Sequence, residues 1–428
     1  MNDKNLSLLK KIISPSFEEN PLPFDISRLE KIIKEKIPAA LKKNAPPNFP
    51  ELYFDFEYVY SKFYDFLLFN QLIGKKVIAL GGGFSSGKST FLNSFLRTGR
   101  ILPTDINPST SVPAYVIYGE AEKAGAVNAF SAKIDMEISD VKSIAHDFGK
   151  DEDSSEEFSL GHLLRSIFVA TPKQSYSNIA FLDTPGYSKP DTENYSAKTD
   201  EKIARSQLNA SDYILWFISA DSGTISVDDL KFLTELDKNI PKWIIINKAD
   251  KAPNTNVLNE MKSAVKSAVN GSGIKIEDIF TFSRREDTEC DRLKIHEVLT
   301  QLNERKTESD FAYSFKKLFT ACKNYYDDEL NYEKRRLSLQ NRALTFSGGT
   351  AEAVDCLNDL VFDTKVAIQK LNDLRQNLLN IQLEFFTEIK SVADKVGIKM
   401  PEPSEIELLN IVNPTATIKN ILKNKNSN

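Results

Sequence analysis

The spacing of apolar residues changes along the chain and divides it into three parts. In residues 1–72 apolar positions recur at helical spacing, without strand-like alternation. Across residues 73–302 short apolar runs alternate with helical stretches, and from residue 303 onward only the helical spacing remains. The pattern predicts N-terminal helices over 1–72, an α/β domain over 73–302, and a C-terminal helical hairpin and tail over 303–428, with both termini contributing to one helical bundle.

The middle part has the pattern of a layered α/β domain. Alternating strands and helices typically form a parallel or mixed sheet with helices on both faces. The predicted strands are Val77–Leu80, Ala114–Tyr118, Ile167–Ala170, Ile179–Leu182, Tyr213–Ile218, Trp243–Ile246 and Ile279–Phe282, with Val127–Met136 as a further candidate.

A segment rich in aromatic residues, Leu52–Gly74, follows the proline-rich break at Asn44–Pro50. A helix with so little polar surface is expected to be wrapped by other helices. The alternative is a helix that dips into a membrane or binds a partner. Its charged residues are mostly acidic, which disfavours binding to anionic lipid.

The C-terminal part carries two apolar series with a seven-residue repeat. Val354, Val361 and Ile368 begin one, and Leu357, Leu371 and Leu378 belong to the other. The glycines at 348 and 349 separate this segment from the preceding helical stretch. The pattern favours an antiparallel hairpin that packs with the N-terminal helices, and an intermolecular coiled coil is the alternative.

Composition limits the classes of function. The formal net charge is −5, which argues against a nucleic-acid-binding or polybasic membrane protein. The three cysteines have no C-x-x-C spacing, so neither a disulfide framework nor a zinc site is expected. No apolar run reaches the length of a membrane-spanning helix, and the N-terminus has no apolar signal core. We expect a cytoplasmic protein, with binding to a membrane surface left open.

A phosphate-binding motif follows the first predicted strand. Gly82, Gly87, Lys88 and Ser89 match G-x-x-x-x-G-K-[ST], in which backbone N–H groups surround phosphates. In this motif the lysine reaches the β- and γ-phosphates and the serine hydroxyl binds Mg²⁺. The predicted phosphate-binding segment is Gly82, Gly83, Phe84, Ser85, Ser86, Gly87, Lys88, Ser89 and Thr90.

Two further motifs directly follow predicted strands, and their order along the chain is the one found in GTPases. The sequence Asp183-Thr184-Pro185-Gly186 offers a carboxylate for Mg²⁺, and the Gly186 N–H can sense the γ-phosphate. The sequence from Asn247 to Asp250 is N-K-x-D, in which Lys248 lies along the base. The Asp250 carboxylate can accept hydrogen bonds from the guanine N1–H and 2-amino group, which adenine lacks.

Two weaker sites complete the predicted active centre. In the loop Asn107–Ser111 a threonine can complete the Mg²⁺ shell and orient the attacking water. We favour Thr110, and Thr104 is the competing candidate. After the last predicted strand, backbone atoms of Ser283, Arg284 and Arg285 can meet the guanine or the ribose.

These motifs resemble those of the dynamin superfamily, and most closely those of bacterial dynamin-like proteins. The resemblance rests on GGGFSSGKSTFLNSFL, ILPTDINPSTSVPAYVIYGE, FLDTPG and IINKAD, and covers about residues 70–300. The 95 residues from Lys88 to Asp183 fit the enlarged GTPase core of that family. The helices on both sides of the core fit its neck bundle.

The resemblance implies a large GTPase that binds GTP and GDP and pairs through its GTPase domains. Ser85 matches the serine that helps to place a monovalent cation, K⁺ or Na⁺, beside Mg²⁺. Thr110 matches the threonine that positions the water, so Ser85, Lys88 and Thr110 are the predicted catalytic residues. Ser89, Thr110 and Asp183 are the predicted metal ligands. Phe84 departs from the glutamine of eukaryotic dynamins, which favours the bacterial branch.

The part after the GTPase core is short for a membrane-remodelling member of the family. We find no apolar tip and no basic lipid patch in it. The first hypothesis is a GTP-hydrolysing protein that dimerises, couples to a helical neck and remodels membranes, alone or with a second dynamin-like or membrane-anchoring protein. The alternative is a GTP-dependent switch whose hairpin recruits a protein partner.

Overall fold

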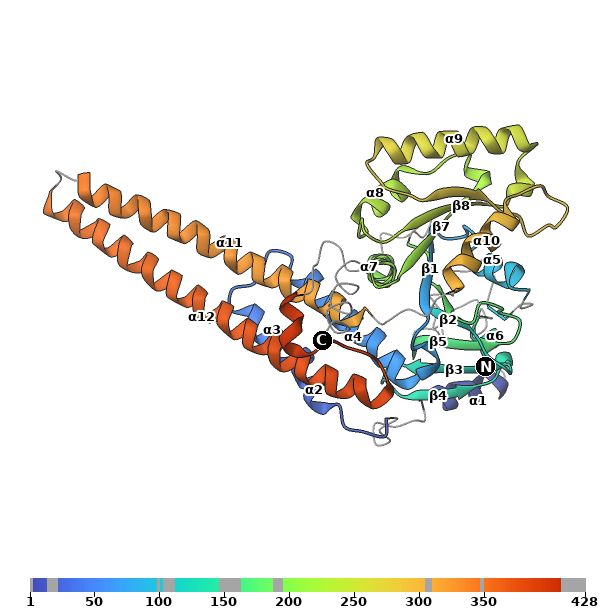
Figure 1. The fold of residues 1–428 in the computed structure, drawn as a ribbon, viewed down its shortest axis with the longest axis horizontal. Helices are drawn as coiled ribbons and strands as arrows, with labels where there is room; N and C mark the ends of the chain where they lie inside the picture. Colours follow the sequence, from blue (N-terminus) through green and yellow to red (C-terminus); the bar gives the residue numbers. More distant parts are fainter. Residues whose placement is uncertain are drawn as a thin grey trace, which may run out of the picture. The chain divides into compact units, whose positions relative to one another are not determined.

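The computed structural model describes residues 3–13, 22–97, 101–102, 112–145, 163–187, 195–304, 310–346 and 350–408. The chain separates into two compact units. The first, here the sheet unit, comprises Met1–Pro23 and Leu68–Thr307, and the second, the helical unit, comprises Phe24–Leu67 and Glu308–Asn428. Figure 1 shows both, and each is described by itself below.

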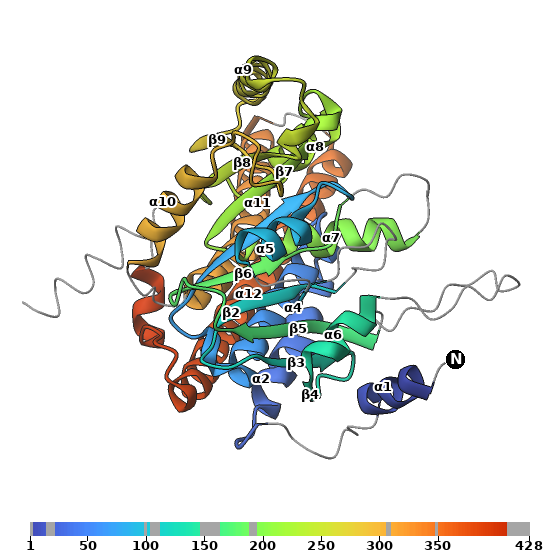
Figure 2. The ribbon, with the colours of Figure 1, turned by 90° about the vertical axis from the view of Figure 1, so that its right-hand side faces the viewer.

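The described part of the sheet unit contains a nine-stranded sheet of order β4-β3-β5-β2-β6-β1-β7-β8-β9 (Figure 2). Five neighbouring pairs are parallel, from β6 through β9 and between β2 and β5, and three are antiparallel. This confirms the predicted mixed, mostly parallel sheet. The strands are β1 (Lys76–Gly82), β2 (Ala114–Tyr118), β3 (Lys123–Asn128), β4 (Lys133–Met136), β5 (Leu164–Thr171), β6 (Ile179–Asp183), β7 (Tyr213–Ser219), β8 (Lys242–Asn247) and β9 (Asp278–Thr281).

Helices cover both faces of the central strands. Successive side chains of a strand point to opposite faces, so apolar side chains on both faces need helices to bury them. Ile78 and Leu80 of β1 pack in one core cluster with Phe91 of α5. A Cβ placed on Gly81 would instead meet Trp216 and Leu208, the latter on α7. The helices of this unit are α1 (Asp3–Ile13), α5 (Lys88–Phe95), α6 (Ile138–Ala145), α7 (Tyr195–Asn209), α8 (Val227–Glu235), α9 (Thr255–Gly271) and α10 (Arg292–Asn303), with the 3₁₀ turns η2 (Asn70–Leu72), η4 (Ala220–Ser222) and η5 (Ala249–Lys251).

The candidate strand Val127–Met136 is wrong as a single element. The structure has the antiparallel hairpin β3–β4 there. The Asn128 side-chain oxygen accepts hydrogen bonds from the backbone N–H groups of Phe130 and Ala132, at 3.0 and 2.8 Å. An asparagine that bonds to the backbone ahead of it stabilises a turn, and this splits the run.

Helix α1 also differs from the sequence-based division, which assigned all of 1–72 to the bundle. Leu8 and Ile12 are buried in the core cluster of the sheet unit. The Asn128 amide donates to the Ile12 carbonyl at 3.0 Å, and Lys11 forms an ion pair with Asp140 at 2.9 Å. An amphipathic helix of eleven residues can cover either unit, and its sequence does not say which.

The helical unit is built on a long antiparallel hairpin of α11 (Phe311–Phe346) and α12 (Ala351–Val396), which lie side by side in Figure 1. Phe315 meets Phe385 with ring centroids 4.6 Å apart, and Arg375 donates to Asp327 at 2.6 Å. The predicted hairpin is therefore confirmed. The N-terminal helices that accompany it are α2 (Ser27–Lys31), the π-helix η1 (Ile32–Lys36), α3 (Ile37–Lys42) and α4 (Phe49–Leu68), and the C-terminal 3₁₀ turn is η6 (Pro403–Leu408).

Burial accounts for the aromatic α4. Phe56 and Phe63 are fully buried, and their rings meet Phe319 and Phe311 edge-on at 5.0 and 5.2 Å. The expectation of a helix wrapped by other helices is confirmed. In the described ranges, no helix is long and apolar enough to cross a bilayer.

We predict that Phe385→Ala destabilises the helical unit by about 3–5 kcal/mol, because a fully buried aromatic side chain leaves a cavity. Leu383→Ala on the same helix is the matched control, since Leu383 is 57% exposed, and its effect is expected within about 0.5 kcal/mol. Urea unfolding followed by circular dichroism measures both. Equal shifts in the two variants would contradict the assigned core.

Candidate functional site

The predicted motifs meet at one edge of the sheet. The segments that follow β1, β6 and β8 leave from the carboxyl ends of parallel strands. In open α/β sheets this edge is where ligands bind. The structure therefore brings the G-x-x-x-x-G-K-S, D-T-P-G and N-K-A-D sequences together although they are far apart in the chain.

The phosphate-binding loop lies between β1 and α5 and needs glycine for steric reasons. Gly87 has φ +88° directly before α5, and a Cβ there would lie 2.3 Å from the Asn247 side-chain nitrogen. Gly82 has φ +135°, and its Cβ would lie 2.3 Å from the Phe217 carbonyl oxygen. Neither conformation nor space permits another residue, so the loop is pressed against β7 and β8.

Lys88 and Asp183 are both buried beneath this loop. The Lys88 ammonium donates to the carbonyls of Gly82 and Gly83, at 3.0 and 3.1 Å. Burial lowers the pKa of Lys88 to about 8, against the opposing effect of nearby Asp183. Burial also raises the pKa of Asp183 to about 6, although the Ser89 hydrogen bond and Lys88 act in the opposite direction. A bound phosphate group would favour the charged form of Lys88.

The oxygen ligands present fit a magnesium ion. The Ser89 hydroxyl donates to Asp183 Oδ2 at 2.5 Å. Asp183 Oδ1 is buried without a hydrogen-bond partner among the described residues. Mg²⁺ prefers oxygen ligands and usually takes one or two from protein, the rest from water and phosphate. Among the described residues, no group of three or more His, Cys, Asp and Glu side chains is placed to hold a metal ion.

The D-T-P-G segment is held from both sides. The Thr184 hydroxyl donates to the Leu80 carbonyl at 2.6 Å. A Cβ on Gly186 would lie 2.9 Å from the Phe84 backbone nitrogen, so this glycine abuts the phosphate-binding loop. The next side chain, Tyr187, donates to Asp229 of α8 at 2.9 Å. Burial, with the Asp229 charge second, raises the pKa of Tyr187 far above its usual range.

The N-K-A-D segment is tied to the phosphate-binding loop by Asn247. Its amide nitrogen donates to the Ser86 carbonyl at 2.8 Å, and its oxygen accepts from the Lys248 N–H at 2.8 Å. Lys248 has φ +58°, and its ammonium lies 3.3 Å from Asp221. The ion pair ties the N-K-A-D segment to the turn that follows β7.

The Asp250 carboxylate is positioned by the loop after β9. Ser283, fully buried, donates its hydroxyl to Asp250 Oδ1 at 2.7 Å. The Arg285 guanidinium lies 3.7 Å from Asp250 Oδ2. Arg292 in turn donates to the Ser283 carbonyl at 2.7 Å. Ser283 therefore orients the carboxylate, and Arg292 fixes Ser283.

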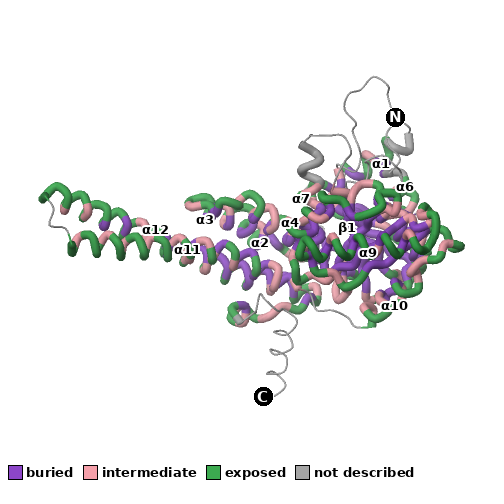
Figure 3. The backbone as a smooth tube through the Cα atoms, turned by 90° about the horizontal axis from the view of Figure 1, so that it is seen from above, coloured by how far each residue is buried: buried purple, intermediate pink, exposed green. Residues whose placement is uncertain are grey.

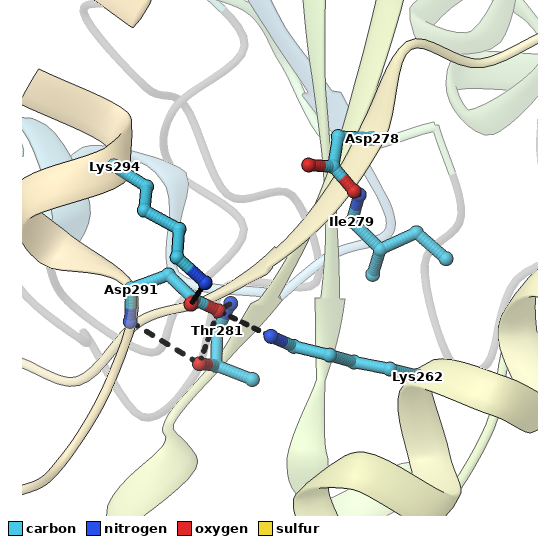
Figure 4. A network of polar contacts seen from close by, with 6 residues as sticks. All are labelled: Lys262, Asp278, Ile279, Thr281, Asp291 and Lys294. Carbon is cyan, nitrogen blue, oxygen red and sulfur yellow. Dashed lines mark hydrogen bonds and ion pairs between the residues drawn. The ribbon is translucent and has the colours of Figure 1, made fainter. Parts of the chain in front are cut away.

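A polar network closes the base of the same loop (Figure 4). Asp291 accepts hydrogen bonds from the Thr281 N–H at 2.9 Å, the Thr281 hydroxyl at 2.8 Å, Lys294 at 2.8 Å, and Lys262. Burial alone would raise the pKa of Asp291. The hydrogen bonds from Lys262, Lys294 and Thr281 outweigh burial and hold the pKa well below its usual range. The network joins β9, α9 and α10 at the point where the loop begins and ends.

The other predicted residues differ in exposure, and some lie outside the described residues. Ser85 is exposed with φ +57°, Arg284 is exposed, and Phe84 and Thr90 are half-buried. Thr110, its competitor Thr104 and the loop Asn107–Ser111 lie outside the described residues.

Three residues escaped the sequence analysis. Asp221 follows the end of β7 at the ligand-binding edge, and this position was the signal that could have identified it. Asp291 and Arg292 carry no motif, and only the fold brings them to the site.

Comparisons with known proteins give one family and a set of distant structures. The model of the family described as "Dynamin family" matches residues 78–250. No curated protein matches the chain. Two solved structures of an oligomerised bacterial dynamin pair, said to sense and tether membranes, each have TM-score 0.41 and 16% identity over 92% of this chain.

This chain spans 56% and 57% of the length of those two proteins. Era from Aquifex aeolicus, bound to GDP·AlF4⁻, is also similar, with TM-score 0.31 and 19% identity over 54% of this chain and 57% of that one.

We predict that Asp291→Asn destabilises the sheet unit by about 1–3 kcal/mol near neutral pH, because it removes the charge from partly buried hydrogen bonds. A depressed pKa contributes stability above the ordinary aspartate pKa, and this contribution is lost as pH falls through and below it. The difference between the two proteins should therefore be smaller near pH 3 than at pH 7. Urea unfolding at pH 7 and near pH 3 measures this, and an equal difference at both would contradict the charged network.

Proposed function

We propose that this chain binds GTP and hydrolyses it to GDP and phosphate, since the model of the Dynamin family matches residues 78–250. The observation that carries the proposal is the meeting of Lys88, Ser89, Asp183, Asn247 and Asp250 at one sheet edge. Each offers a group that a guanine nucleotide needs. Asn247 contacts the phosphate-binding loop, Asp183 contacts Ser89, and Asp250 is held by Ser283.

Base selection is assigned to Asp250. With Ser283 holding one carboxylate oxygen, the group is oriented to accept hydrogen bonds from the guanine N1–H and 2-amino group. Adenine has no donors at these positions and would leave the carboxylate unpaired, so ATP should be rejected. Arg285 lies beside the same carboxylate and has to yield to the base.

Phosphate binding is assigned to the loop after β1. Its backbone N–H groups and the start of α5 face the phosphates, and Lys88 would leave the carbonyls of Gly82 and Gly83 to meet the β- and γ-phosphates. Ser89 and Asp183 would hold Mg²⁺, which neutralises charge on the phosphates. Thr110 is proposed to position the attacking water and to complete the Mg²⁺ shell, and Ser85 to help place K⁺ or Na⁺.

Dimerisation of the GTPase domains belongs to the same proposal. The exposed position of Ser85 at the phosphate end supports a site that a second copy completes. Membrane remodelling, alone or with a second dynamin-like or membrane-anchoring protein, is the proposed role for the helical unit. The second candidate is a GTP-dependent switch that recruits a partner, and the tether from Tyr187 to Asp229 favours it, since α8 would respond to the D-T-P-G segment.

Steady-state GTP turnover against protein concentration, in K⁺ and in Na⁺ buffer, tests the proposal and separates the two candidates. Lys88→Ala should abolish turnover by removing the phosphate-binding cation, whereas Lys231→Ala, an exposed lysine of α8, should leave it unchanged. Rising activity per molecule would support the dimerising GTPase, and flat, slow activity the switch. Turnover retained by Lys88→Ala would overturn the assignment of the site.

A further inference from the structure

The loop between β9 and α10 presents an arginine to the carboxylate that is assigned to base selection. Residues 284–290 of this loop are exposed or half-buried, the classes coloured green and pink in Figure 3, whereas Ser283 before them is buried. Asp250 Oδ1 accepts a hydrogen bond from the Ser283 hydroxyl, and Asp250 Oδ2 lies 3.7 Å from Arg285 Nε. Each oxygen of the carboxylate therefore has a neighbour in the segment that follows β9.

Ser283 positions Arg285 as well as Asp250. The backbone N–H of Arg285 donates to the Ser283 hydroxyl at 3.0 Å, and the same hydroxyl donates to Asp250 at 2.7 Å. Arg292 fixes Ser283 by donating to its carbonyl at 2.7 Å. The backbone of Arg285 is thus held beside the carboxylate by buried hydrogen bonds, while its side chain is 68% exposed and has room to move.

Arg285 does not pair with the acidic residues of its own loop. In the described chain it forms an ion pair with none of them. Glu286 pairs with Arg97 at 4.0 Å instead, and Glu289 accepts a hydrogen bond from Thr255 at 3.2 Å. The fold therefore directs Arg285 to the base-reading carboxylate rather than to the acids nearest in sequence.

Arginine and guanine offer a carboxylate the same kind of edge. A guanidinium group carries its N–H donors in one plane and can bind a carboxylate through two parallel hydrogen bonds. Guanine contains the same nitrogen–carbon–nitrogen unit in its ring, and its N1–H and 2-amino group are two donors side by side. A guanidinium group beside Asp250 and a bound guanine therefore require the same carboxylate oxygens.

We propose that Arg285 is an internal competitor of the guanine base at Asp250. In the empty site it neutralises a carboxylate that is only 16% exposed, and it turns into solvent when a base binds. During release it returns to the carboxylate and takes the place of the leaving base. Arg285 thereby lowers nucleotide affinity and speeds nucleotide release. This role rests on the proposed function, since it requires Asp250 to read guanine.

The direction of the effect separates competition from simple attraction. An arginine that attracts an anionic nucleotide strengthens binding, so its removal weakens binding. An arginine that occupies the base-reading carboxylate reduces the fraction of molecules ready to bind, so its removal strengthens binding. Solvent-exposed ion pairs are formed a few times more often than they are broken, which lowers the apparent affinity by about two- to sixfold.

Titration of the full-length protein with GDP and Mg²⁺ in a calorimeter tests this role, and displacement of a fluorescent GDP analogue measures release. Arg285→Ala should bind GDP about two- to sixfold more tightly and release it more slowly. Arg285→Gln, polar and uncharged, should behave in the same way. At 1 M salt the Debye length is about 3 Å, so the difference from the unchanged protein should shrink.

The matched control is Lys266→Ala, which removes an exposed positive charge from α9 in the same unit. This variant should bind and release GDP as the unchanged protein does. It shows how far the loss of one positive charge, at a place remote from the carboxylate, alters the binding of an anion.

A double-mutant comparison tests whether the effect passes through Asp250. Asp250→Asn removes the charge with which Arg285 pairs, and its amide can donate to the 2-oxo group of XDP, the diphosphate of xanthosine. In this background, adding Arg285→Ala should change XDP affinity by less than about twofold. Tightening of equal size in both backgrounds would show that Arg285 acts without the carboxylate, and would overturn the proposal.

Failure of this role and failure of the guanine site give different results. Weaker or unchanged GDP binding by Arg285→Ala, with GDP binding by the unchanged protein, would overturn the competitor role alone. If the unchanged protein bound no GDP, the proposed function would fall together with the role that rests on it.

Discussion

The close approach of backbones at the carboxyl edge of the sheet is the constraint on which the site depends. Gly82 lies against the Phe217 carbonyl, Gly87 against the Asn247 side chain, and Gly186 against the Phe84 backbone. A single Cβ at any of these positions would separate the phosphate-binding loop from β7, from the N-K-A-D segment or from the D-T-P-G segment. Because glycine has no Cβ, the three motifs can approach one another closely enough to form one surface.

The same edge is held by hydrogen bonds at the end where Asp250 lies, the proposed base-binding end. Asn247 bonds to the phosphate-binding loop, Ser283 to Asp250, and Arg292 to Ser283. Asp291 anchors both ends of the intervening loop to β9 and α10. If Asp250 reads the base as proposed, its carboxylate loses little conformational freedom on binding, and such preorganisation strengthens discrimination between bases.

The sequence predicts the strands well where local pattern decides the structure. The predicted apolar runs correspond to β1, β2, β5, β6, β7, β8 and β9, with small shifts at their ends. They could be recognised because strands buried on both faces are apolar throughout. It failed at β3–β4, where one asparagine side chain makes the turn. It also failed at α1, whose apolar stripe does not specify the unit that it covers.

The sequence could predict those residues of the candidate site that belong to short motifs. Lys88, Ser89, Asp183 and Asp250 are such residues, and their grouping at one edge follows from parallel strands. Asp291 and Arg292 act through tertiary contacts with Thr281 and Ser283, and no local pattern marks them.

The most direct test of the guanine-binding site is the ratio of GTP to XTP affinity for the unchanged protein and for Asp250→Asn. Xanthine carries a 2-oxo group where guanine carries the 2-amino group, and an asparagine amide can donate to it. The account predicts that the variant loses GTP affinity by about a hundredfold or more and gains XTP affinity. The asparagine NH2 would face the guanine 2-amino group, which is also a donor, but it can donate to the xanthine 2-oxo group. An unchanged ratio would show that Asp250 does not read the base and would contradict the account.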